Sequence, residues 1–356
     1  MKPIDFPEKY ENLMRVAQQA LANQQYQQAK ELFQRAYELK ESFEANSLLV
    51  FCLYELDEKK EALKQALLHE KQYLQNEEFA EFYFDLLIST QDFLYARKLI
   101  ASTDFYEAFE QRVIEKIQFA EELSGQMERQ KIKALHNKSE ELPSLEPARQ
   151  LASIDEIEQL PYHEFIQTAS KLIVSPEVHI LARAKLLETL RQLNECHPVF
   201  YLTIEEKLVK VIPKDLPKPQ QQASYQQLCV FSDRYGNEDA LLSSVLKEEF
   251  TLQSAIVYPV YDTYIEDPKR WFQLTVEACT GKTMYEGTED EKQDFLKKKR
   301  KNFAANDLLP LDFISEKDKN VMKNKDSIHS ICLQFERVSV LFKGMHETFL
   351  MYKMNF

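Results

Sequence analysis

The amino-acid sequence predicts a mainly α-helical protein, with an N-terminal array of paired helices followed by a second helical domain that carries one small β-hairpin. Helix-forming residues dominate the chain, and only 5 of its 356 residues are glycine, which argues against nucleotide-binding folds and β-rich folds. A small residue returns at nearly equal spacing as Ala29, Ala62 and Ala96. In a helical background, a period of about 34 residues indicates stacked helix pairs.

Composition and charge narrow the class of protein further. The net charge of −13 disfavours nucleic acid as a partner, because phosphate binding needs a basic surface. Five dispersed cysteines without a Cys-x-x-Cys pair are typical of reduced thiols. The first residues lack the apolar core of a secretory signal, and no apolar run approaches the roughly 18 residues of a membrane span. We therefore expect a cytoplasmic protein without a membrane segment.

The first predicted domain covers residues 1–124. After a proline-containing lead-in over 1–8, helices are expected over 10–22 and 26–40, with small residues Ala17 and Ala29 where the two approach each other. Two further pairs follow in the same register. A long amphipathic helix with apolar residues from Phe105 to Leu123 should cap the array, because a terminal repeat must hide its apolar face.

A charged helix running into a linker is expected over 125–150, and a helical domain over 151–356. Ser153 to Glu156 has the pattern of a capping box, and Pro176 is expected to open a helix. Runs 199–204 and 208–212 are β-rich and predict the hairpin. Further helices are expected over the ranges 161–173, 221–234, 238–247, 252–264 and 268–279. The apolar end, 327–356, is interpreted either as a final helix that closes the core or as a tail.

The repeat resembles the tetratricopeptide repeat, whose second helix carries a small residue, an aromatic four residues later and an alanine three after that. Ala29, Phe33 and Ala36 follow this spacing. The second copy departs from it, since Lys59 stands where the family places an aromatic. The middle of the chain is also loosely similar to uncharacterised bacterial proteins with this repeat. An unrelated antiparallel helical array remains the alternative.

The resemblance implies a concave face lined by the first helix of each pair. Transferred by register, this face is acidic and carries two aromatic side chains. Its residues are Glu11, Met14, Gln18, Glu44, Ser47, Phe51, Tyr54, Glu78, Glu81 and Asp85. Such a face favours a basic or amphipathic peptide. In the family, a carboxylate clamp of Lys, Asn and Arg side chains at such positions captures the acidic end of a partner chain. These residue types are absent here, which disfavours a partner of that kind. A solvated acidic face without a ligand is the alternative.

Motifs with catalytic or metal-binding chemistry are weak. Residues Thr280 to Thr283 match the last residues of a phosphate-binding loop. That loop also needs a glycine five residues before Gly281, and Val276 occupies this position, so we interpret Gly281 as a helix cap. Cys196 and His197 offer two metal ligands without a second pair nearby. The basic run 297–301 is interpreted as a solvated helix end.

These observations favour a non-catalytic scaffold that binds a protein or peptide, needs neither cofactor nor metal, and can self-associate. Two alternatives remain: a peptide-sensing regulator, which needs an output element, and an enzyme with a pocket in the second domain.

Overall fold

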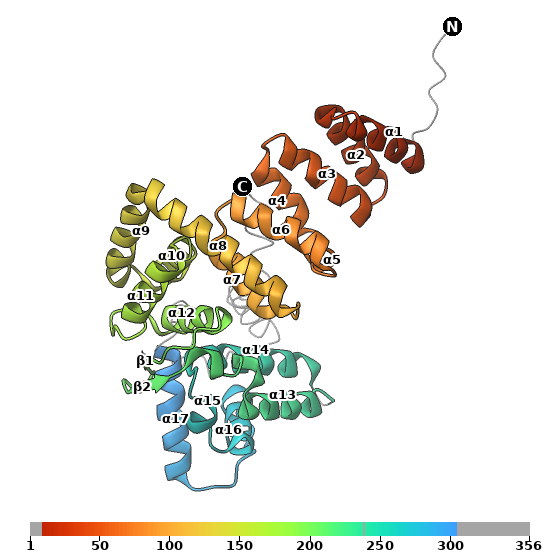
Figure 1. Cartoon of the computed structure of the whole chain (residues 1–356). Helices are drawn as coiled ribbons and strands as arrows, with labels where there is room; N and C mark the ends of the chain where they lie inside the picture. Colours follow the sequence, from red (N-terminus) through yellow and green to blue (C-terminus); the bar gives the residue numbers. More distant parts are fainter. Residues whose placement is uncertain (1–8, 238, 305–356) are drawn as a thin grey trace. The chain divides into compact units, whose positions relative to one another are not determined.

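The computed structural model of the chain describes residues 9–304, except residue 238 (Figure 1). The predicted lead-in over 1–8 and the apolar end 327–356 lie outside the described residues. Within them the protein is mainly α-helical with one two-stranded antiparallel sheet, as predicted. The chain divides into two units, the first ending at Glu128 and the second beginning at Arg129.

The first unit consists of helix pairs and a long last helix (Figure 1). Its helices are α1 Tyr10–Ala22, α2 Tyr26–Leu39, α3 Phe43–Glu55, α4 Lys59–Leu67, the short α5 Glu70–Tyr73, α6 Glu77–Ser89, α7 Phe93–Ser102 and α8 Glu107–Met127. The small residues Ala17, Ala29, Ala62 and Ala96 are fully buried where helices meet. The boundaries predicted for the first pair, 10–22 and 26–40, agree with α1 and α2 to within one residue.

The turn inside each pair repeats with the same backbone geometry. Gln24, Asp57 and Gln91 have φ values of 59°, 61° and 64°. The next residue in each turn donates its N–H to a carbonyl five residues earlier, as Gln25 does to Ala20 at 2.9 Å. These three turns recur with the same spacing as the buried alanines. The first unit is therefore a helical repeat in its backbone as well as in its sequence.

The irregular α5 separates the second and third pairs, and polar contacts hold it in place. Tyr73 donates to the Oδ1 atom of the buried Asn46 at 3.2 Å, and Tyr83 donates to Glu70 at 2.8 Å. Tyr95 donates to the same Glu70 oxygen. This inserted turn was not predicted, because the sequence period continues through it unchanged.

The second unit begins with α9 Arg129–Glu141, the 3-10 turn η1 Leu142–Ser144, α10 Pro147–Ile157, α11 Tyr162–Leu172 and α12 Ile180–Gln192. The hairpin pairs β1 Val199–Leu202 with β2 Leu208–Val211, so that Tyr201 faces Val209. Then follow η2 Pro213–Asp215, η3 Pro219–Gln221, α13 Ala223–Tyr235, α14 Ala240–Ile256, α15 Tyr261–Tyr264, α16 Pro268–Thr280 and α17 Glu289–Ala304. Helix α12 is buried on nearly every side.

Several expected boundaries in the second unit are wrong. Ser153 lies inside α10, where its hydroxyl donates to the Arg149 carbonyl, and the helix begins at Pro147 instead. Pro176 lies in a turn, and α12 starts after His179. The helix expected over 238–247 and the first part of the one expected over 252–264 form a single helix, α14, because no proline or glycine lies between residues 240 and 256. The end of the second expected helix is the separate α15, after Pro259. The charged helix predicted within 125–150 is present as α9, and the expected linker after it holds η1 and the start of α10.

In the described part of the chain, no helix combines the length and the apolar character needed to cross a membrane. The cysteines at positions 52, 196, 229 and 279 are thiols, without a disulfide among the described residues. Cys332 lies outside that range.

Candidate protein-binding surface

The residues predicted to line a binding face lie on α1, α3 and α6, and most of them reach solvent. Glu11, Gln18, Glu44 and Glu78 are exposed. The side chains of Ser47, Tyr54, Glu81 and Asp85 are half-buried. Met14 is different: only 5% of it is exposed, so it belongs to the core and its predicted place on the surface is wrong.

An aromatic cluster joins α2, α3 and α6. Phe51 is 37% exposed, and its ring lies 6.5 Å from that of Tyr26 and 6.1 Å from that of Phe82. Tyr54 meets Phe82 edge-on at 5.5 Å. Edge-to-face aromatic pairs orient one another, so the exposed ring of Phe51 is held in a defined position. Sequence reasoning identified Phe51 and Tyr54 but missed Tyr26 and Phe82 as their support.

Part of the predicted acidic face is neutralised within the first unit. Lys116 on α8 donates to Glu81 at 2.8 Å and to Asp85 at 3.0 Å. The hydrogen bond and positive charge of Lys116 hold the pKa of Glu81 below its ordinary value. Lys116 lies one repeat period, 34 residues, after Phe82. Continuing the repeat from the third pair into α8 would therefore have predicted that Lys116 lies beside the face of α6. The predicted set keeps three exposed carboxylates outside this contact, on α1, α3 and α6: Glu11, Glu44 and Glu78.

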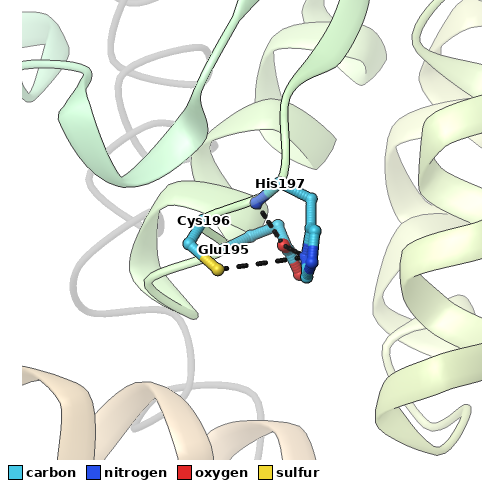
Figure 2. A group of neighbouring side chains, drawn as sticks. All are labelled: Glu195, Cys196 and His197. Carbon is cyan, nitrogen blue, oxygen red and sulfur yellow. Dashed lines mark hydrogen bonds and ion pairs between the residues drawn. The ribbon is translucent and has the colours of Figure 1, made fainter.

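A second cluster lies in the second unit, directly after α12. Glu195, Cys196 and His197 bring a carboxylate, a thiol and an imidazole within 4.8 Å of one another (Figure 2). Oε1 of Glu195 lies 2.7 Å from both the backbone nitrogen and Nδ1 of His197, and Tyr162 donates to Oε2 at 2.7 Å. Sequence reasoning noted the Cys–His pair but not the buried carboxylate beside it.

Hydrogen bonding outweighs burial at the carboxylate of Glu195. Burial has the largest single effect and pushes its pKa upward. The donors from His197 and Tyr162 together pull the pKa below its ordinary value. Glu195 therefore stays ionised and fixes the turn between α12 and the hairpin.

The geometry of this cluster does not match a nucleophile with its general base. Nδ1 of His197 is the nitrogen nearest both Glu195 and the Cys196 sulfur, the latter at 3.9 Å (Figure 2). In a working triad the imidazole uses one nitrogen for the carboxylate and the other for the nucleophile. Structural zinc sites take four ligands that surround the ion, whereas here Nδ1 of His197 lies 2.7 Å from Oε1 of Glu195, in direct hydrogen-bonding contact. The cluster is best explained as a structural turn.

Two further features of the second unit bear on chemistry. Gly281 ends α16 with φ 68°, which confirms its interpretation as a helix cap. A small pocket between α15, α16 and α17, with room for about one water molecule, is lined by Tyr264, Trp271, Phe295 and charged residues. Two of the charged groups at this pocket, Arg270 and Glu291, pair at 3.4 Å.

No known protein family, no curated protein and no solved structure matches the chain.

Proposed function

We propose that the protein is a non-catalytic scaffold that binds a protein or peptide partner through the exposed surface of α1, α3 and α6. The observation that carries this proposal is the exposed ring of Phe51, which is oriented by Tyr26 and Phe82 and lies on the same helix as the exposed Glu44. An aromatic side chain held rigidly at a surface contributes contact area at low entropic cost.

The character of the repeat supports the same proposal. Its turns and buried alanines recur at the spacing of tetratricopeptide repeats, so we assign the first unit to that type of array. Stacked helix pairs present extended surfaces on which partner proteins bind. Glu11, Glu44 and Glu78 add negative charge, so we propose a basic or amphipathic partner in the cytoplasm.

The test is affinity capture from a lysate of the source organism, with bound proteins quantified by mass spectrometry. The wild type is compared with a Phe51→Ser/Glu44→Lys variant and with Leu39→Ser. Leu39 is a matched control because it is 53% exposed on α2, outside the proposed surface. We expect a partner retained by wild type and Leu39→Ser and lost by the double variant. Equal capture by all three would refute the proposal.

A further inference from the structure

Helix α8 carries an apolar stripe on its outer side. Phe119, Leu123 and Met127 are 69%, 48% and 77% exposed, and their spacing of four residues places them along one face. The opposite faces of the same helix are buried through Phe109, Val113, Ile117 and Glu121. Leu123 was predicted to pack inward and instead belongs to this exposed stripe. A continuous apolar stripe of this kind marks an interaction surface.

The stripe continues the surface described above. Phe119 follows Phe51 by two repeat periods, and α8 therefore takes the place of the first helix of a fourth pair. Lys116, one turn before Phe119, reaches Glu81 and Asp85 on α6. This contact joins the outer face of α8 to the face of α6 that was predicted to bind.

Charges around the stripe indicate what covers it. The cations Arg112 and Lys116 are engaged by carboxylates of α6, with Arg112 lying 4.0 Å from Glu77. On the other border, Glu115 accepts from Gln111 at 2.8 Å and Glu122 accepts from Gln118 at 3.2 Å. Glutamine amides are neutral, so these hydrogen bonds leave the negative charge of both carboxylates in place. A second copy of α8 on the stripe would bring like charges together.

We propose that α8 forms the second half of the binding surface and that the occupant is a basic amphipathic helix of a partner protein. Its apolar side chains contact Phe119, Leu123 and Met127, and its lysines or arginines face Glu115 and Glu122. The inference rests on the proposed function of the α1, α3 and α6 surface, and it names the chemistry of the partner.

A labelled synthetic peptide tests this inference by fluorescence anisotropy with the full chain. The probe is an amphipathic helix of about 18 residues, long enough for five turns, with leucines on one face and lysines on the other. A scrambled peptide of the same composition and a leucine–glutamate analogue are the comparison peptides. We expect the leucine–lysine helix to bind, and the Phe119→Ser/Leu123→Ser variant to weaken it by about tenfold or more. Glu115→Lys/Glu122→Lys should weaken it as well, whereas Leu39→Ser should not.

The outcomes separate this inference from the proposed function. If Phe51→Ser weakens the peptide but the α8 variants do not, the inference is wrong and the proposed surface stands. If neither weakens it, or if the scrambled peptide binds equally well, the inference is wrong, and the affinity capture described above decides the proposed function independently. Sedimentation of the wild type tests whether a second copy of this chain covers the stripe. Self-association that Phe119→Ser abolishes would show that it does, and would overturn the inference. Circular dichroism of each variant verifies that it is folded.

Discussion

Arg97 on α7 and Glu121 on α8 form a two-pronged ion pair, in which Nε and Nη2 of the guanidinium donate to the carboxylate oxygens at 2.6 to 3.2 Å. Only 15% of the Arg97 side chain and 7% of the Glu121 side chain are exposed. This pair helps to fix which face of α8 packs against α7. The remaining outer face is the one that presents Phe119.

We predict that Glu121→Ala lowers the free energy of unfolding by about 3 kcal/mol, because it leaves the guanidinium of Arg97 largely buried without its carboxylate. Glu122→Ala is the matched control, since the neighbouring carboxylate is exposed and its loss should cost less than about 0.5 kcal/mol. Urea denaturation measures both. Equal losses for the two variants would contradict the structural role of the pair.

Overpacking should identify the alanines that set the distance between paired helices. Ala29→Leu adds volume at a fully buried position, so we expect a loss of about 1–3 kcal/mol in the free energy of unfolding. Gln28→Leu changes the exposed neighbour and should leave that free energy within about 0.5 kcal/mol. Thermal denaturation compares them. An unchanged melting temperature for Ala29→Leu would refute the close helix contact.

The left-handed turn residues offer an independent test of the repeat. At Gln24, whose φ is 59°, valine should destabilise the protein by about 1 kcal/mol, because a β-branched side chain is strained there. Glycine should be tolerated or slightly stabilising at the same position. The order of unfolding midpoints in urea, glycine above valine, is the expected result. The reverse order would show that the turn has another conformation.

Thiol reactivity should separate the cysteines by burial. Burial, with a smaller effect from Glu55, raises the pKa of Cys52 to about 11, and burial raises that of Cys279 to about 11 as well. Cys196 is exposed. With iodoacetamide at mildly alkaline pH, mass spectrometry should find Cys196 modified before Cys279, and Cys52 modified only after unfolding. Modification of Cys52 at the rate of Cys196 in the native protein would contradict the packing of α3.

Glu195 predicts a pH-dependent contribution to stability. Its pKa is lower in the folded state than in the unfolded state, so its stabilising effect is present above the unfolded value of about 4.3 and is lost as the pH falls through the folded value. Tyr162→Phe removes one donor and should cost about 1–2 kcal/mol at neutral pH. This difference should shrink as the pH falls through the folded pKa of Glu195, which lies below its ordinary value, because the carboxylate becomes protonated there. A constant difference across that range would show that the phenol acts through packing alone.

The sequence predicted much of the fold because periodic patterns are local. The spacing of Ala29, Ala62 and Ala96 was enough to place the paired helices, and the β-rich runs were enough to place the hairpin. The ends of helices were harder to predict where no proline, glycine or capping residue marks them. Nothing in the residues of α14 distinguishes one helix from two, and the inserted α5 does not disturb the period.

The candidate surface was predicted only in part, because it depends on contacts between helices. Phe51 was identified from its register, but the neutralisation of Glu81 and Asp85 comes from Lys116, which is distant in sequence. The same register, extended by one repeat, places Phe119, yet the sequence alone suggested that α8 only caps the array. Met14 was misplaced because a register position does not determine which way a long side chain packs.

Site-specific photo-crosslinking in the source organism tests the central claim most directly. A photoreactive phenylalanine analogue is placed at position 51, at position 119, or at the control position 39. We predict that positions 51 and 119 crosslink to the same partner protein and that position 39 does not. A common product from all three positions, or crosslinks from position 39 alone, would contradict the proposed surface.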